Sequence, residues 1–200
     1  MANANRPSGL TPVQYLNGAA WNGQARLYSI VASYATALAI GDPVTLSGTA
    51  NSDGVAGINI ATAGDANMVL GSIVGLGRYE GGIFNPANLD QIIRPAADVN
   101  TWYAMVADDQ NIIFEIQDIG TGTPLAATDV GANVNLVSGT NNGYVSGWML
   151  NNASKGTNAT YQVKLLGLAR RSDNVIGQYA KWLVKINNHS YGTGTGQTGV

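Results

Sequence analysis

The amino-acid sequence predicts a mainly β protein, an antiparallel β-barrel or sandwich of jelly-roll-like character with an extended N-terminal arm and a flexible C-terminal tail. Short apolar runs alternate with clusters of Gly, Asn, Asp, Ser and Thr, and 26 of the 200 residues are Gly. Several runs have the two-residue alternation of a strand, and no window keeps a helical period over the length of a helix. We therefore expect an arm over residues 1–25, a β body over 26–190 and a Gly/Thr-rich tail over 191–200.

The first 25 residues look too irregular for a core element, because Asn, Pro and Gly interrupt every apolar run. They still carry large apolar side chains, which a polar linker would not need: Leu10, Val13, Tyr15, Leu16 and Trp21. We expect these side chains to bind another protein surface, as the anchors of an extended arm do. A chain lacking residues 1–20 should then stay folded and lose its partner. The alternative is an ordinary N-terminal strand packed on its own domain.

The first half of the body is expected to contain strands at 27–31, 37–40, 44–46 and 69–76. Turns separate them. Gly41-Asp42-Pro43 is one, because Pro fixes φ and Asp bonds the local backbone, and Asn51-Ser52-Asp53-Gly54 is another. A looser stretch follows over residues 77–100.

The clearest unit covers residues 102–117. Alternate residues in each half share a face: Trp102, Ala104 and Val106 in the first, then Ile112, Phe114 and Ile116 in the second. Residues 107–111, Ala followed by four polar residues, are expected to form the loop between the two runs. This pattern predicts a β-hairpin.

Two later strands also alternate cleanly, at 161–165 and 180–186. In the second, Lys181 and Lys185 share a face opposite Trp182, Val184 and Ile186. One polar face and one apolar face are typical of an antiparallel sheet with one side in water. Further strands are expected around residues 134–136 and 144–150, and a turn or short helix over 173–179.

Composition argues against several functions. Charged residues make up 11% of the chain, against about 25% in an average globular protein, and a weakly charged surface is easily desolvated by protein contact. Ten scattered basic residues and a net charge of −2 do not suit a nucleic-acid partner. The chain has no Cys, and the apolar stretch 27–40 is too short and too interrupted to span a bilayer. We expect no nucleic-acid or membrane partner, and synthesis in a cytoplasm, since no signal-peptide pattern opens the chain.

Candidate catalytic groups are few. Asp108, Asp109 and Glu115 could form the carboxylate pair of a glycosidase. However, Asp is favoured in turns for its backbone bonds, and Glu115 falls on the polar face of its strand. The single His, His189, has no second His or Cys with which to build a zinc site, and we expect it to hydrogen-bond at a strand end. We therefore expect no enzyme activity, no cofactor and no metal.

Several segments together resemble the head structural proteins of tailed phages, in particular the decoration or cement proteins. The resemblance lies in hydrophobic and turn patterns spread over most of the chain. The segments are 5–13 with 16–18, 39–44, 106–117, and 166–169 with 173–174 and 184–189. It implies a structural protein on the capsid surface of the virion that binds the major capsid protein as a homo-oligomer, a dimer in preference to a trimer, and stabilises the shell.

Other functions stay open. A carbohydrate-binding module or receptor-binding head fibre would gather exposed aromatic side chains beside Asn and Asp in one concave site, and the chain has four Trp and nine Tyr. The major capsid protein itself would need a long helix, which the sequence does not predict. A glycosidase would lose its activity on Glu115→Gln.

Overall fold

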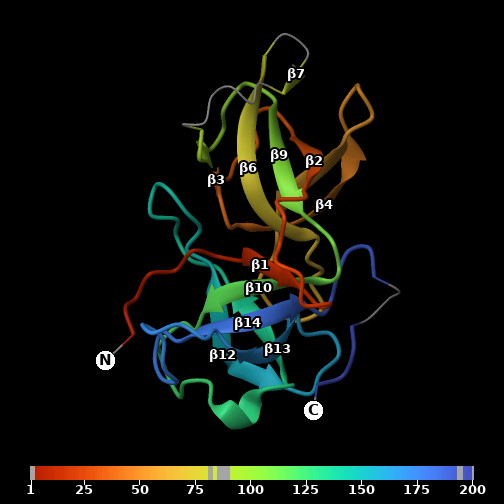
Figure 1. The fold of residues 1–200 in the computed structure, drawn as a ribbon. Coiled ribbons are helices and arrows are strands. Elements are labelled where there is room, and N and C mark those ends of the chain that lie inside the picture. The colour runs from red at the N-terminus through yellow and green to blue at the C-terminus, as the bar shows by residue number, and fades with distance from the viewer. Residues whose placement is uncertain (1–2, 81–82, 85–90, 193–195, 200) are drawn as a thin grey trace.

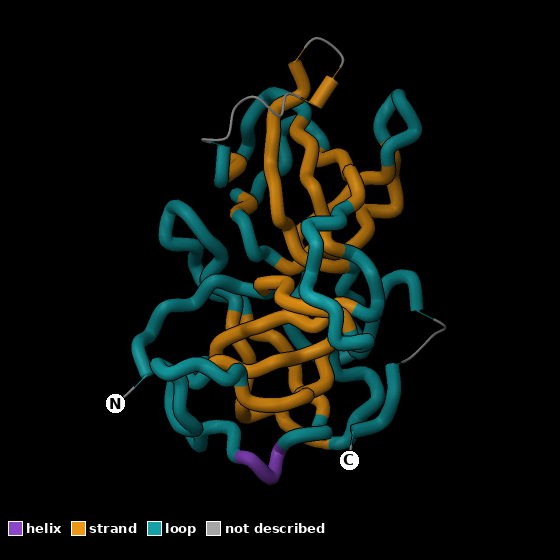
Figure 2. The backbone as a smooth tube through the Cα atoms, viewed as in Figure 1, coloured by secondary structure: helices purple, strands orange, loops and turns teal. Residues whose placement is uncertain are grey.

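The computed structural model describes residues 3–80, 83–84, 91–192 and 196–199 (Figures 1 and 2). These residues form strands and one short 3-10 helix, η1. The elements are β1 Thr11–Tyr15, β2 Arg26–Ile30, β3 Leu38–Ala39, β4 Pro43–Ala50, β5 Ala56–Ile60, β6 Gly71–Glu80, β7 Ile83–Phe84, β8 Ile93–Arg94, β9 Trp102–Ala107, β10 Ile112–Gln117, η1 Ala127–Asp129, β11 Asn133–Val137, β12 Met149–Gly156, β13 Val163–Leu168 and β14 Lys181–Ile186. The mainly β, antiparallel fold class is confirmed.

The strands build two lobes, each with its own core (Figure 1). In the first lobe the pairing runs β4-β5-β2-β9-β6 and returns from β6 to β4, so five strands close a small barrel, fewer than the eight of a jelly roll. All its pairs are antiparallel except β2 with β5. We call it the first barrel; its core includes Tyr28, Ile30, Val44, Ile73 and Trp102.

The second lobe is one six-stranded sheet in the order β1-β10-β14-β13-β11-β12, which we call the second sheet. Backbone pairing of Asp118 with Leu150 brings the residues after β10 against β12, so the sheet curls round its core. Phe114, Trp182 and Val184 are fully buried inside it. The alternating faces expected for residues 180–186 are confirmed, with Trp182, Val184 and Ile186 buried and the lysines partly exposed.

The hairpin expected over residues 102–117 is wrong. Both strands exist with the expected faces, but β9 pairs with β2 and β6, whereas β10 pairs with β1 and β14. The physical reason is that each apolar face enters a different core: Trp102 packs in the first barrel and Phe114 in the second sheet. Residues 108–111 carry the chain from one lobe to the other (Figure 1).

Other expectations hold in shortened or shifted form. The strand expected at 37–40 keeps two residues, as β3, and the one expected at 161–165 begins at Val163. Residues 173–179 form turns. Part of the loose stretch expected over 77–100 lies outside the described residues, and its described portion contributes β7 and β8.

The N-terminal segment lies along its own chain. Residues 11–15 form β1 at the edge of the second sheet, and the chain then turns back so that Trp21 N–H donates to the Val13 carbonyl at 3.1 Å. Before β1, Gln117 donates to Asn5 at 2.8 Å, and the Arg6 N–H donates to Gln117 at 2.8 Å. The described part of this segment thus follows the alternative of a strand packed on its own domain, because β10 has a free edge to pair with it.

The end of the chain is also fastened where it is described. The Lys164 ammonium donates to the Thr198 carbonyl at 2.7 Å, and Asn133 donates to the Gln197 carbonyl at 2.7 Å. The Gly199 N–H donates to the Thr157 carbonyl at 3.0 Å. Residues 196–199 therefore lie against the body, because side chains of the second sheet donate hydrogen bonds to their carbonyls. This differs from the flexible tail expected over 191–200.

Candidate functional site

The five side chains expected to bind a partner lie in different environments. Leu10 is completely buried in the core of the second sheet and is unavailable to a partner. Tyr15 and Trp21 are half-buried and pack against that core. Val13 is half-buried, and Leu16 is 46% exposed at the turn after β1. Leu10 alone of the five is closed to a partner, and Leu16 is the most exposed of them.

Val13 lines a groove across the outer face of the second sheet, with a volume of about 980 Å³. We call it the sheet groove. Two leucines of the outer face also line it, the half-buried Leu166 of β13 and Leu183 of β14, whereas Leu168, at its border, packs against the core beside Trp182. An outward sheet face is usually polar, so leucines at such positions leave apolar area in water. The structure thus adds two outward leucines, Leu166 and Leu183, to Val13 of the expected set.

Ion pairs border the sheet groove. Arg171 lies 2.9 Å from Glu115 and 3.1 Å from Asp173, and Lys181 lies 3.5 Å from Glu115. Together with Arg170, which also lines the groove, the cations outnumber the carboxylates here by three to two. The two carboxylates raise the pKa of Arg171, and the largest part of this effect comes from the hydrogen bond to Asp173. Glu115, a glycosidase candidate, is thus held in ion pairs on an open sheet face.

One signal in the sequence could have shown this groove. Leu183 lies between Lys181 and Lys185, on the polar face of an alternating strand. A large aliphatic residue in that place interrupts the polar face. The other groove residues, Leu166 and Leu168, could not be placed, because a bulge between Leu165 and Gly167 changes the alternation of β13.

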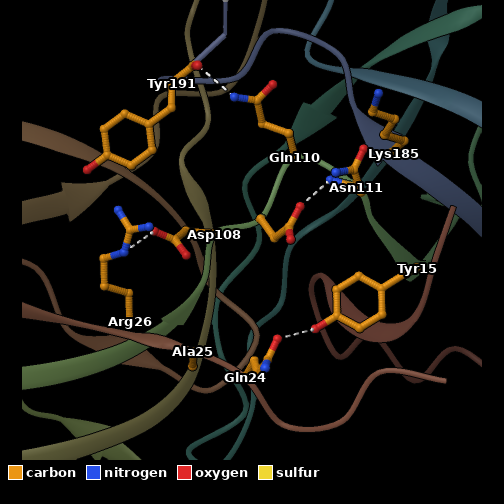
Figure 3. A pocket seen from close by; sticks show the side chains of 10 residues that line it. Tyr15, Gln24, Ala25, Arg26, Asp108, Gln110, Asn111, Lys185 and Tyr191 are labelled. Carbon is orange, nitrogen blue, oxygen red and sulfur yellow. Dashed lines mark hydrogen bonds and ion pairs between the residues drawn. The ribbon is translucent and has the colours of Figure 1, made fainter. Parts of the chain in front are cut away.

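A second hollow, of about 820 Å³, lies between the two lobes (Figure 3). We call it the junction cleft. Five separate segments line it, with these residues: Tyr15; Gln24, Ala25 and Arg26; Asp108, Asp109, Gln110 and Asn111; Lys185; and Tyr191. Tyr15 and Tyr191 lie on opposite sides, with the residues of the 108–111 connection between them (Figure 3). Sequence reasoning missed this cleft, because its residues come together only through the packing of the two lobes.

Asp108 is the centre of a hydrogen-bonded cluster at one wall of the junction cleft. Its carboxylate accepts from the Tyr28 hydroxyl at 2.6 Å and lies 3.4 Å from the Arg26 Nε. Burial, then the hydrogen bond to Asp108, raise the pKa of Tyr28, so the phenol stays protonated. The Tyr28 and Tyr191 hydroxyls lie 3.1 Å apart, and the Arg26 guanidinium lies 5.6 Å from the centre of the Tyr191 ring.

The single His lies behind this wall. His189 Nδ1 accepts the Tyr191 N–H at 3.0 Å, and Nε2 lies 3.1 Å from the Asp108 carbonyl oxygen. A carbonyl can only accept, so Nε2 carries the proton of the neutral ring. Burial lowers the pKa of His189 in spite of the carboxylates of Asp108 and Asp109. The hydrogen bonding expected for His189 after a strand is confirmed.

Asp109, the other carboxylate of the 108–111 connection, bonds its own turn. Asp109 accepts the Asn111 N–H at 2.7 Å, which is the turn role expected for it. Among residues 3–80, 83–84, 91–192 and 196–199, no group of three or more His, Asp or Glu side chains is placed to hold a metal ion. The described residues include no helix with the length and apolar character needed to cross a membrane.

Comparison with family models, with curated proteins and with solved structures gives no match to this chain.

Proposed function

We propose that the protein is a non-enzymatic structural protein of the virion, which decorates the outside of a tailed-phage head as a homo-oligomer and stabilises the shell. The observation that supports this best is the sheet groove. A row of half-exposed aliphatic side chains on an open sheet face, bordered by charges, has the composition of a protein-binding surface, with an apolar centre and a polar rim. The resemblance of the sequence segments to decoration proteins supports the same proposal.

The partner in this proposal is the major capsid protein, and the contact is mainly apolar. Val13, Leu166 and Leu183 supply area that is removed from water on binding, at about 25 cal/mol for each Å² of apolar surface. The excess of cations beside them favours a capsid surface that carries carboxylates. Because a homo-oligomer offers several copies of the groove, weak single contacts add up to firm attachment on a symmetric lattice.

The test uses heads that lack this protein, incubated with the purified chain. Leu183→Asp places a carboxylate in the apolar centre of the groove and should abolish attachment. Val99→Asp is the matched control, because Val99 is 79% exposed in the first lobe, far along the chain from the groove, and should attach like the unaltered protein. Cosedimentation with heads measures both, and circular dichroism checks that both are folded. Equal attachment by the two variants, or no attachment by the unaltered chain, would refute the proposal.

A further inference from the structure

We propose that the junction cleft binds a neutral oligosaccharide of two or three sugar units. The proposal does not depend on attachment to a phage head, because it concerns a different surface from the sheet groove. The volume of the cleft, about 820 Å³, lies within the usual range for small-ligand sites. Residues of both lobes contribute to the cleft, and small-ligand sites often lie where two structural units meet.

The polar groups of the cleft match the needs of sugar hydroxyls, which donate and accept at once. The exposed side chains of Gln24, Gln110 and Asn111 each carry an amide that donates and accepts, and Asp109 adds an acceptor. The Gln110 amide is aimed by its bond to the Tyr191 carbonyl, at 2.6 Å. Four such groups around one hollow can pair with several hydroxyls of a single ligand.

Two tyrosines supply the apolar part. Tyr15 and Tyr191 flank the cleft from opposite sides (Figure 3). The Tyr15 hydroxyl donates to Asn22 at 3.1 Å, and the Tyr191 hydroxyl pairs with that of Tyr28. Their rings are thus held in place with aromatic surface at the cleft, against which the C–H face of a sugar ring packs. Fixed side chains lose little conformational entropy on binding, which favours affinity.

Charge selects a neutral ligand. Arg26 and Lys185 carry positive charge and Asp108 and Asp109 negative charge, so the formal charge of the lining sums to zero. The Arg26 and Asp108 side chains already pair with each other at 3.4 Å. With that pair set aside, the exposed carboxylate of Asp109 and the cation of Lys185 remain at the cleft, so a charged ligand of either sign would meet a like charge as well as an opposite one. The lining therefore gives a charged ligand, such as phosphate or a sialylated glycan, no net attraction over a neutral one.

The experiment titrates the purified chain with maltotriose, cellotriose and tri-N-acetylchitotriose as neutral probes and with 3′-sialyllactose as the anionic comparison, followed by calorimetry and NMR. We expect at least one neutral probe to bind with a Kd of about 1 mM or tighter. Tyr191→Ala and Asn111→Ala should each weaken that binding about tenfold or more, since each removes a stacking or hydrogen-bonding group. Asn111 makes no side-chain contact that folding requires among the described bonds, so this variant should fold normally.

Tyr144→Ala is the matched control. Tyr144 is 66% exposed on the 138–147 loop and does not line the cleft, so its removal should leave the affinity unchanged. Binding of none of the neutral probes, binding of sialyllactose alone, or equal loss in Tyr144→Ala and Tyr191→Ala would overturn the proposal. Attachment of Tyr191→Ala to heads, measured separately, keeps the failure of this inference distinct from failure of the decoration function.

Discussion

Gly9 and Gly41 lie backbone against backbone where the two lobes meet. A Cβ added to Gly9 would overlap the carbonyl oxygen of Gly41, and one added to Gly41 would overlap the carbonyl of Ser8. This close approach lets the Leu10 N–H donate to the Gly41 carbonyl at 2.9 Å, while the Gly41 N–H donates to Ile73 at 2.8 Å. The start of the second sheet is thereby joined directly to the first barrel.

Gly9→Ala should therefore destabilise the protein by roughly 2–5 kcal/mol, from a strained positive φ together with the overlap at Gly41. Gly23→Ala separates the two causes. Gly23 also has a positive φ, of 84°, but open space surrounds its Cβ position, so only the backbone cost of about 1 kcal/mol remains. Urea unfolding of the two variants measures the difference. Equal losses would mean that the contact with Gly41 does not contribute.

Gln162 is a second link between the lobes, and its removal should be costly. Its completely buried amide accepts from the Gly64 and Leu136 N–H groups at 3.0 and 3.1 Å and donates to the Thr62 carbonyl at 2.8 Å. Gln162→Leu leaves these groups unpaired, and we expect a loss of roughly 3 kcal/mol or more. The exposed Gln178 gives the control, since Gln178→Leu should change stability by less than about 0.5 kcal/mol. Thermal unfolding compares the two; a small effect of Gln162→Leu would contradict the link.

The sequence allowed the strands and their faces to be predicted, but not their partners. Alternation is a local property, so Trp102 and Phe114 could be assigned to apolar faces from their neighbours alone. The partners of β9 are β2 and β6, so its pairing depends on the edges that two strands far from it along the chain offer. A short polar connection predicts a hairpin only when both apolar faces enter one core. Here they enter two different cores, and no feature of residues 107–111 themselves indicates this.

The candidate sites were less accessible to sequence reasoning than the fold. Spacing does not distinguish Leu10, which fills a core, from Leu16, which lies in solvent, because both interrupt the same irregular segment. The junction cleft gathers Tyr15, Asn111 and Tyr191 from segments about 80 or more positions apart in the chain. Such a site exists only after two lobes have packed. Residue type alone could suggest that Tyr and Asn bind sugars, but not which of them meet.

The stability of the protein should fall as the pH decreases from 7 towards 5, and His189 should be one cause. Burial lowers the pKa of His189 in the folded state below its ordinary value of 6.5. The unfolded chain therefore takes up a proton at a pH where the folded chain does not, and stability present above pH 6.5 is lost as the pH falls through the folded pKa. His189→Gln should reduce this slope.

The measurement is the free energy of unfolding of both chains at several pH values between 5 and 7. Burial raises the pKa of Asp42, which acts in the opposite direction, but Asp42 is present in both chains and cancels in the comparison. Identical slopes for the two chains would show that His189 does not titrate between its folded and unfolded states in this range.

Two leucines six residues apart should differ sharply in their effect on stability. Leu10 is 0% exposed in the core of the second sheet, whereas Leu16 is 46% exposed at a turn. Leu10→Ala should cost roughly 2–5 kcal/mol because it leaves a cavity, and Leu16→Ala less than about 0.5 kcal/mol.

The comparison also bears on a chain lacking residues 1–20. That truncation removes Leu10 and the whole of β1, so we expect it to unfold more readily instead of leaving an intact body. Chemical denaturation of the three chains tests this, and an unaltered midpoint for the truncated chain would restore the view of residues 1–25 as a detachable arm.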